Sequence, residues 1–291
     1  MKDLKGIYAA LITPFKGSGE VDYSQLKKVV AHLIEKGIDG FYVGGSTGEA
    51  FLLSVEERKR ILEAVLEENN SRAKVIAHAG SIGTDLTVDL ALHAKKAGAD
   101  AVSAVTPFYY KFSPEEVINY YCEIADRTDM PTIIYNFPNL TGYALSVKDV
   151  DALAKNPNIA GVKFTAMDLY TLERFKQRHP NLTFFNGFDE ILLYGLMAGA
   201  DGGIGSTYCF MPEKYRKLMD LFKAGKYEEA RSLQHEINDL IDVVAKYGAM
   251  ATTKEFLSLE GFDCGICRSP FKPLSDEAKA EIKKAFDAKL K

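Results

Sequence analysis

Cysteine is scarce in this sequence, with four residues in a chain of 291. Cys122, Cys209, Cys264 and Cys267 are too few and too scattered for a disulfide framework in a chain of this length. Reduced thiols are typical of the cytosol, so we expect a cytoplasmic protein. The last two cysteines have the spacing of a redox or zinc motif, but neither a second pair nor a nearby histidine completes a ligand set. We interpret all four as ordinary thiols.

A long hydrophobic run is also missing. The N-terminus becomes polar again within a few residues of its first apolar run, and it lacks the regions of a signal peptide. The most apolar stretch, residues 191–204, is interrupted by Asp201 and several glycines and falls short of the ~20 residues that a membrane helix needs. We therefore expect neither secretion nor a membrane partner.

Charge of one sign is not in excess, because 40 acidic residues stand against 36 basic ones and the two kinds are interspersed. A net charge of −4 leaves no basic patch for DNA or RNA, so a nucleic acid is not an expected partner. Metal ligands are sparse as well. No ligand spacing appears among the five histidines, which are His32, His78, His93, His179 and His235. We therefore expect no metal.

Short β-branched, apolar runs alternate with longer segments of helical period along most of the chain. The expected strands are residues 6–12, 40–43, 74–79, 101–105, 132–135, 159–164, 183–186 and 202–205. The expected helices between them are residues 23–36, 55–68, 86–97, 114–125, 147–154, 169–178 and 190–198. About eight strands in this rhythm predict a parallel β/α architecture, and 291 residues suffice for one α/β barrel.

A doubly wound sheet shows the same alternation, so the position of the polar motifs has to decide between the two folds. Nearly every expected strand runs into a polar or glycine-rich loop, and in a barrel all these loops meet at the C-terminal mouth. We therefore predict a (β/α)8 TIM barrel, with the barrel core in residues 1–210. Residues 211–291 are predicted to form C-terminal helices (212–224, 226–247 and 275–290) that complete the barrel and pack on it in the same globular unit.

Lys163 lies in a nearly all-apolar expected strand, residues 159–164, where an ammonium group would be poorly solvated. Lysine is seldom fully buried unless it is paired or functional. Desolvation lowers the pKa of a lysine and makes its free amine available as a nucleophile toward a carbonyl. The alternative is a lysine at the end of a strand that extends its ammonium group to solvent. Tyr135 ends the preceding strand, where it is either a proton shuttle near Lys163 or an amphipathic packing residue.

The segment Gly44–Glu49 follows one strand and precedes a helix, and it offers backbone N–H groups and the hydroxyls of Ser46 and Thr47. Such a loop suits an anionic oxygen group, for which a carboxylate is the expected guest. The spacing matches neither the P-loop nor the dinucleotide fingerprint. A tight turn that needs glycine explains the glycines but not the paired hydroxyls.

Asp189 and Glu190 add two carboxylates at the end of another strand, and Ser206 adds a hydroxyl at the end of the next. Together these groups suit a polyol. A divalent metal is the alternative ligand, but no histidine or third carboxylate is near in the sequence. Glycosidase chemistry also uses two carboxylates, but the side chains of adjacent residues diverge and rarely flank one bond.

Five motifs in order resemble those of the N-acetylneuraminate lyase and dihydrodipicolinate synthase family, and the resemblance spans nearly the whole chain. They are Gly44–Glu49, Thr106–Tyr110, Tyr135–Pro138, Gly161–Thr165 and Gly202–Ser206. Members of this family are barrels that form a lysine Schiff base with pyruvate. The resemblance implies a carbon–carbon lyase of the class I aldolase type that uses no organic or metal cofactor.

The same resemblance assigns roles to single residues. It makes Lys163 the Schiff-base residue and Tyr135 the proton relay, helped by Tyr109 from a neighbouring subunit of a homotetramer. Ser46 and Thr47 hold the pyruvyl carboxylate, so Thr47 belongs to both the catalytic and the binding set. The residues that contact the sugar chain are Thr165, Gly187, Asp189, Glu190 and Ser206.

The subfamilies differ in what they bind beyond pyruvate. Synthases place an arginine two residues after the proline of the Tyr-Asn motif to bind a second carboxylate, whereas this chain has Leu140. Leu140 argues against aspartate semialdehyde. Residues 187–190 and 163–170 look like the lyase, so the resemblance favours sialic acid as substrate, cleaved reversibly into pyruvate and N-acetylmannosamine. The alternatives are an aldolase for a keto-deoxy sugar acid or a dihydrodipicolinate synthase. A barrel that binds a sugar acid without turnover is a further alternative, but it gives Lys163 and Tyr135 no purpose.

Overall fold

Eight strands follow one another in chain order and close into a barrel in the computed structural model, which describes residues 3–291. They are β1 (Gly6–Ala10), β2 (Gly40–Val43), β3 (Lys74–His78), β4 (Ala101–Val105), β5 (Thr132–Asn136), β6 (Ile159–Phe164), β7 (Thr183–Asn186) and β8 (Gly202–Gly205). The pair β1–β2 and the successive pairs from β3 to β8 are parallel. The predicted TIM barrel is confirmed.

Helices follow the strands in regular alternation. Those of the repeating pattern are α1 (Tyr23–Glu35), α2 (Val55–Asn69), α3 (Thr84–Ala97), α4 (Pro114–Thr128), α6 (Val147–Leu153), α7 (Leu169–Arg178) and α8 (Leu192–Met197). Four more follow β8, namely α9 (Pro212–Lys223), α10 (Tyr227–Tyr247), α11 (Ala249–Leu259) and α12 (Asp276–Lys289). Short helical turns in the loops are η1 (Ala50–Leu52), α5 (Pro138–Thr141), η2 (Asp189–Ile191) and η3 (Thr207–Cys209).

Local sequence accounts for these elements. Every residue of β1, β4, β5 and β6 is buried, as expected for parallel strands that are covered on both faces. Three helices, α2, α4 and α6, begin with a capping box in which a serine side chain accepts a bond from a backbone N–H one turn later. The serines are Ser54, Ser113 and Ser146. Each box satisfies two N–H groups that a helix start would otherwise leave without a partner.

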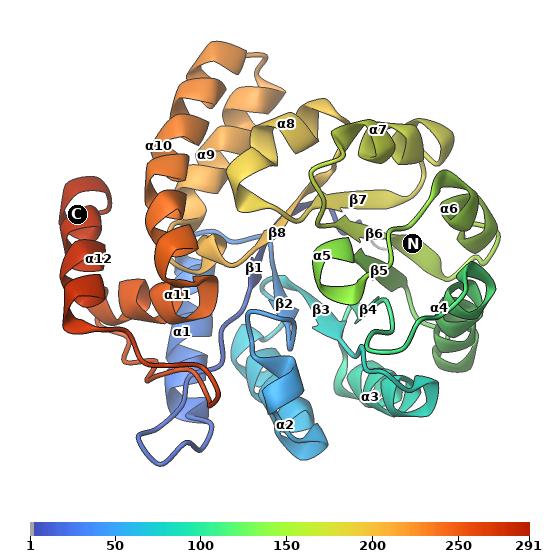
Figure 1. Ribbon diagram of the computed structural model, residues 1–291, viewed down its shortest axis with the longest axis horizontal. Helices are drawn as coiled ribbons and strands as arrows, with labels where there is room; N and C mark the ends of the chain where they lie inside the picture. Colours follow the sequence, from blue (N-terminus) through green and yellow to red (C-terminus); the bar gives the residue numbers. More distant parts are fainter. Residues whose placement is uncertain (1–2) are drawn as a thin grey trace. The chain divides into compact units, whose positions relative to one another are not determined.

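Contacts within the chain group its residues into two compact units. The first unit joins residues 3–6 with Lys74–Ile204. In it, the strands β3 to β8 lie side by side, and each helix packs against the next, from α3 and α4 through α6 and α7 to α8 (Figure 1). Because these strands are parallel, their C-terminal ends lie at the same edge of the sheet. The loops that carry the polar motifs between residues 106 and 190 begin at this edge.

The second unit joins Ile7–Ala73 with Gly205–Lys291. Here α1 packs against α2, and α10 packs against α9, α11 and α12 (Figure 1). The C-terminal helices thus share one packed unit with the loop that follows β2. The predicted division of the chain into a barrel core of residues 1–210 and C-terminal helices of residues 211–291 stays a prediction.

One C-terminal helix was missing from the prediction. The sequence pattern predicted three helices after residue 211, but the structure has four, because α11 forms between Ala249 and Leu259. Gly248, with a φ of +92°, separates α11 from α10. Two threonines, Thr252 and Thr253, are buried on α11 beside Phe256 and Leu257, so its buried face lacks a clear apolar pattern. Within residues 3–291, no helix combines the length and the apolarity needed to cross a membrane.

Candidate active site

The candidate nucleophile lies on β6, within the first unit. Lys163 is the fifth residue of β6, and its backbone is in register with Tyr135 of β5 on one side and Phe185 of β7 on the other. Tyr135 is in turn in register with Val105 of β4. The lysine and the tyrosine that the sequence predicted to meet are therefore direct neighbours across two strands.

Lys163 is buried, with 4% of its surface exposed, so the alternative of a lysine extended to solvent is wrong. Its Nζ lies 4.0 Å from the centroid of the Tyr135 ring. Burial lowers the pKa of the Lys163 amine to about 7, and the nearby Asp189 carboxylate acts in the opposite direction and raises it. A large share of the amine is therefore neutral and nucleophilic at neutral pH.

Aromatic rings enclose Tyr135. Its ring stacks on Phe137, with centroids 5.8 Å apart, and Phe137 meets Phe188 edge to face at 6.0 Å. The His78 ring stands edge-on to Tyr135 at 6.0 Å, and His78 Nε2 accepts a bond from the Val105 N–H at 3.2 Å. Because Tyr135 is only 3% exposed and is packed on several sides, its phenol has a fixed position next to Lys163.

The end of β6 approaches the end of β7 closely. Thr165 donates its backbone N–H to Asn136 O at 2.9 Å, and Gly187 donates to Phe164 O at 2.8 Å. A Cβ atom on Gly187 would come within 1.9 Å of Thr165 Oγ1, so only glycine fits there. The Thr165 hydroxyl is buried and has no hydrogen-bond partner among the residues that the structure describes. This hydroxyl can therefore form a hydrogen bond to a bound molecule.

The two predicted sugar-binding carboxylates begin the short helix η2. Asp189 is buried and lies close enough to Lys163 to influence its pKa, whereas Glu190 is half-buried. Tyr109 differs from all other predicted site residues, because it is 83% exposed and has a φ of +78°. The first unit thus brings Lys163, Tyr135 and Asp189 together and leaves Tyr109 at the surface.

The remaining predicted residues, Ser46, Thr47 and Ser206, belong to the second unit. The loop after β2 folds into a tight turn, in which Gly48 and Ala50 donate to Gly45 O, at 3.1 and 3.3 Å. Gly44 allows the turn because its φ is +72°. Ser46 and Thr47 are half-buried, and so is Ser206, whose side chain makes no capping bond to η3.

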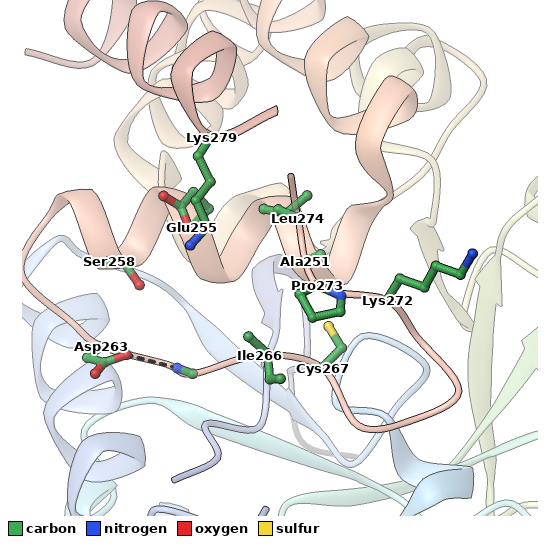
Figure 2. Close-up of a pocket in the computed structure, with 11 residues that line it drawn as sticks. Ala251, Glu255, Ser258, Asp263, Ile266, Cys267, Lys272, Pro273, Leu274 and Lys279 are labelled. Carbon is green, nitrogen blue, oxygen red and sulfur yellow. Dashed lines mark hydrogen bonds between the residues drawn. The ribbon is translucent and has the colours of Figure 1, made fainter. Parts of the chain in front are cut away.

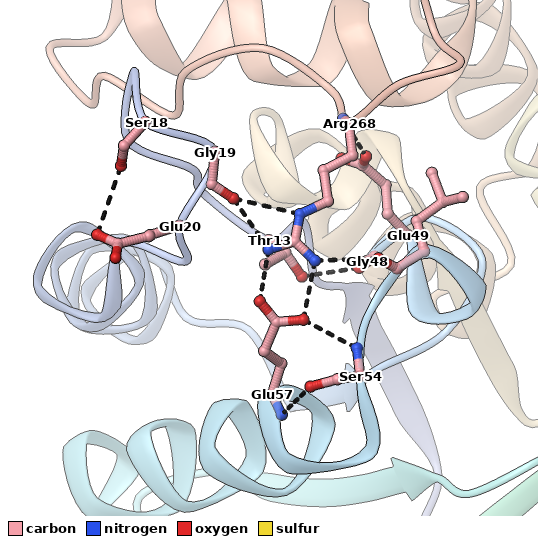
Figure 3. A network of polar contacts seen from close by, with 10 residues as sticks. Thr13, Ser18, Gly19, Glu20, Gly48, Glu49, Ser54, Glu57 and Arg268 are labelled. Atoms are coloured by element: carbon pink, nitrogen blue, oxygen red, sulfur yellow. Dashed lines mark hydrogen bonds and ion pairs between the residues drawn. The ribbon is translucent and has the colours of Figure 1, made fainter.

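Glu49 closes this turn, and the sequence analysis did not predict its partners. Glu49 is buried and forms an ion pair with Lys254 of α11, with Oε1 and Nζ 2.7 Å apart. Its other oxygen, Oε2, accepts the backbone N–H of Arg268 at 2.7 Å. The Arg268 side chain also binds Glu57 at the start of α2 and the carbonyl oxygen of Gly19 (Figure 3). Between 205 and 249 residues separate these partners in the chain, so no local pattern could have predicted the contacts.

A pocket of the second unit lies away from the predicted residues. It has a volume of about 310 Å³ and lies beside α11, the start of α12 and the segment from Asp263 to Leu274 (Figure 2). None of the predicted site residues lines it in the described part of the chain. Cys267 is part of its wall, and burial raises the pKa of this thiol to about 11 and that of Cys264 to about 12. Both thiols are protonated at neutral pH and are therefore weak nucleophiles.

The described residues contain no cluster of potential metal ligands. No three His, Cys, Asp or Glu side chains come together there as metal ligands. That the reaction runs without a metal or an organic cofactor stays a prediction. The chemistry that the geometry does offer is that of an amine nucleophile beside a phenol that can move a proton.

Comparisons with known proteins agree with this chemistry. A family model described as the Dihydrodipicolinate synthetase family matches residues 3–289. The chain is 44% identical over 283 residues to N-acetylneuraminate lyase from Escherichia coli (strain SMS-3-5 / SECEC). The aligned region covers 97% of this chain and 95% of that protein. CdNal from Clostridium difficile in complex with mannosamine superposes with a TM-score of 0.97 at 42% identity, covering 99% of this chain and 100% of that chain. N-acetylneuraminate lyase from Fusobacterium nucleatum complexed with pyruvate gives a TM-score of 0.95 at 40% identity, covering 99% of this chain and 98% of that chain.

These matches extend over nearly the whole length of both partners, so they concern the complete barrel and not a shared fragment. The motifs that pointed to a Schiff-base barrel lie within the matched residues. The chain belongs to the dihydrodipicolinate synthetase family.

Proposed function

We propose that this chain catalyses the reversible retro-aldol cleavage of N-acetylneuraminate into pyruvate and N-acetylmannosamine through a Schiff base on Lys163. It is a carbon–carbon lyase of the class I aldolase type. One observation carries the proposal: a buried lysine with a pKa of about 7 lies in strand register with a buried tyrosine. The similarity to N-acetylneuraminate lyases, at 44% identity over 97% of the chain, supports the choice of substrate.

The reaction begins when the neutral Lys163 amine attacks the C2 ketone of open-chain N-acetylneuraminate and water leaves to give an iminium. The C3–C4 bond then breaks, and its electron pair moves into the iminium to form an enamine. Tyr135 accepts the C4 hydroxyl proton, directly or through the substrate carboxylate, as the aldehyde of N-acetylmannosamine forms. Protonation of the enamine at C3, with the help of Tyr135, and attack of water on the iminium release pyruvate and restore the amine.

The other site residues bind and orient the substrate. Ser46 and Thr47 hold the carboxylate in both the ground state and the transition state. The buried Thr165 hydroxyl, which has no partner among the described residues, and the Asp189 carboxylate suit the hydroxyl groups of the sugar chain. Gly187, Glu190 and Ser206 complete this group by family resemblance. Their contribution is orientation of the aldehyde part for bond cleavage.

The proposal includes a cytoplasmic homotetramer. A tyrosine that helps the reaction from a neighbouring subunit must extend from its own subunit, and Tyr109 is 83% exposed in the single chain. Exposed apolar side chains on α7 and α8, namely Tyr170, Tyr194 and Met197, offer additional surface for assembly. Few and scattered cysteines support the cytoplasmic location.

Trapping of the Schiff base tests the proposal. Wild-type protein and Lys163→Ala are incubated with pyruvate and borohydride, their intact masses are measured, and release of pyruvate from N-acetylneuraminate is assayed in parallel. We expect a stable adduct only in the wild type, together with pyruvate release. No adduct on active, folded wild-type protein would overturn the mechanism.

A second candidate is another pyruvate-dependent aldolase or synthase of the same family. An adduct without pyruvate release from N-acetylneuraminate would favour it, and a panel of keto-deoxy sugar acids and aspartate semialdehyde would then identify the substrate. Leu140 on α5 argues against aspartate semialdehyde, because its exposed apolar side chain cannot bind a second carboxylate.

A further inference from the structure

Glu49 occupies an unusual place for a carboxylate. It is 3% exposed, and its backbone has a φ of +58°, in the left-handed region that residues other than glycine seldom adopt. A conformation of this kind persists only where the surrounding structure enforces it. The contacts of the Glu49 side chain therefore indicate what fixes the loop.

Two donors hold the Glu49 carboxylate, and both come from the C-terminal part of the chain. Lys254 Nζ binds Oε1 at 2.7 Å, and the Arg268 N–H binds Oε2 at 2.7 Å. Lys254 is itself buried, lies 4.3 Å from the centroid of the Phe15 ring and also donates to Ile266 O at 3.3 Å. The ammonium thus joins the loop after β2 to the segment that contains Arg268.

The segment before Arg268 is anchored as well. Phe15 donates its N–H to Cys264 O at 3.1 Å, and a Cβ on Gly265 would come within 2.0 Å of Phe15 O. The Arg268 guanidinium binds Glu57 and Gly19 O and lies 4.6 Å from the centroid of the Phe15 ring. Arg268, whose N–H binds Glu49, is therefore held in place by several contacts of its own side chain (Figure 3).

The position of Glu49 determines that of the residues before it. Its N–H donates to Ser46 O at 3.0 Å, and Gly48 O accepts the Thr13 hydroxyl at 2.8 Å. A change in the Glu49 side chain would relax the left-handed backbone and with it the turn that holds Ser46 and Thr47. The hydroxyls of these two residues are the groups that the proposed function assigns to the substrate carboxylate.

We propose that Lys254 and Glu49 are positioning residues, which set the affinity of the enzyme for the carboxylate of its substrate by fixing the Ser46–Thr47 turn. This inference rests on the proposed function. It also gives the C-terminal helices a role in the reaction, since α11 supplies Lys254. Because the turn holds the carboxylate equally in the ground and transition states, loosening it affects KM more than kcat.

The test compares Lys254→Met with Lys246→Met. Lys254→Met removes the ammonium group from the buried ion pair, and Lys246→Met removes it from an exposed pair with Glu281 in the same unit. We expect Lys254→Met to raise the KM for N-acetylneuraminate, and the half-saturating pyruvate concentration in borohydride trapping, by about tenfold, with kcat within about twofold. Lys246→Met should match the wild type in KM, in the half-saturating pyruvate concentration and in kcat.

A double variant separates positioning from folding. Lys254→Met leaves a buried charge on Glu49, and Glu49→Gln/Lys254→Met removes both charges. If the single variant does not fold, the folded double variant takes its place, and it should show the same rise in KM because the turn has lost its ionic anchor. A wild-type KM and wild-type trapping in a folded variant, with only Tm reduced, would overturn the inference.

The outcome also distinguishes this inference from the proposed function. If the wild type forms no pyruvate adduct on Lys163, the proposed function fails. If the wild type traps pyruvate and releases it from N-acetylneuraminate while Lys254→Met keeps a wild-type KM, only the positioning role fails.

Discussion

Lys163 must be a neutral amine to attack a ketone, so its protonation sets the lower pH limit of the reaction. Burial lowers its pKa to about 7, and the free amine is the major form above that pH. We expect the rate of adduct formation with pyruvate to rise about tenfold between pH 6 and pH 8 and to level off above. Trapping with cyanoborohydride at a series of pH values measures this rate. A profile that keeps rising toward pH 10 would contradict the lowered pKa.

Asp189 provides the matched variant for the same measurement. Its carboxylate raises the pKa of Lys163 against the effect of burial, so Asp189→Asn should move the midpoint of the pH profile below that of the wild type. The same change should raise the KM for the sugar acid more than it alters pyruvate trapping, because Asp189 is assigned to the sugar chain. An unchanged midpoint would show that the two side chains are not coupled.

The sequence could predict the surroundings of a residue where its neighbours in the chain carry a clear pattern. A lysine in an apolar strand predicted a buried amine, and the structure confirms its burial. The pairing of Glu49 with Lys254 had no such signal, because these residues are 205 positions apart and neither lies in a motif with the other. This ion pair depends on the packing of α11. The sequence pattern did not predict that helix, because buried threonines interrupt its apolar face.

At the scale of elements, an irregularity between β5 and β6 decides which residues meet. Thr132 pairs with Ile159, but Ile133 pairs with Gly161, so Ala160 is an extra residue in β6. Without this bulge, Tyr135 would pair with Val162 instead of Lys163, and side chains on a strand alternate between its two faces. The sequence predicted both strands and the nearness of Tyr135 to Lys163, but it could not predict the bulge, because register depends on pairing.

Gly161 allows the strands to approach at the bulge. A Cβ at this position would come within 2.0 Å of the backbone oxygen of Thr183 in β7. We therefore expect Gly161→Ala to reduce the free energy of unfolding by about 1–3 kcal/mol, since the added methyl group forces the backbone to shift. Its rate of pyruvate trapping should fall as well, because a shift of the β6 backbone displaces Lys163, two residues further on, from its place beside Tyr135. Denaturant unfolding and mass spectrometry measure the two effects.

Gly83 is the matched control for this substitution. It lies in the same unit, precedes α3 and has open space where a Cβ would stand. Gly83 is the N-cap of α3, where glycine is preferred to alanine, so Gly83→Ala should reduce stability by about 0.5–1 kcal/mol and should leave trapping unchanged. Equal losses of stability in both variants would mean that the close approach to Thr183 is not the reason why position 161 requires glycine.

At the scale of the whole molecule, the number of strands and the polar loops after them sufficed to predict the closed barrel. The signal was strong because parallel strands are apolar throughout and their boundaries are sharp, as the exact prediction of β2, β4, β6, β7 and β8 shows. The sequence pattern contains less information about the assembly of subunits. An exposed Tyr109 is recognisable as unusual only when its surroundings are known, because tyrosine is common both inside proteins and at interfaces.

Mixing two inactive variants tests whether Tyr109 acts across subunits. Tyr109→Phe and Lys163→Ala should each lose most activity as pure assemblies, the first for lack of the assisting phenol and the second for lack of the nucleophile. If each site takes Lys163 from one subunit and Tyr109 from its neighbour, a mixed pair has one complete site. Co-expression in equal amounts should then restore about a quarter of the wild-type specific activity, since about half of the pairs are mixed and one of their two sites is complete. Coupled assay of pyruvate release from the purified mixed assembly measures this recovery. If Tyr109 acts within its own subunit, every site lacks either the phenol or the lysine, and the mixture stays as inactive as its parents.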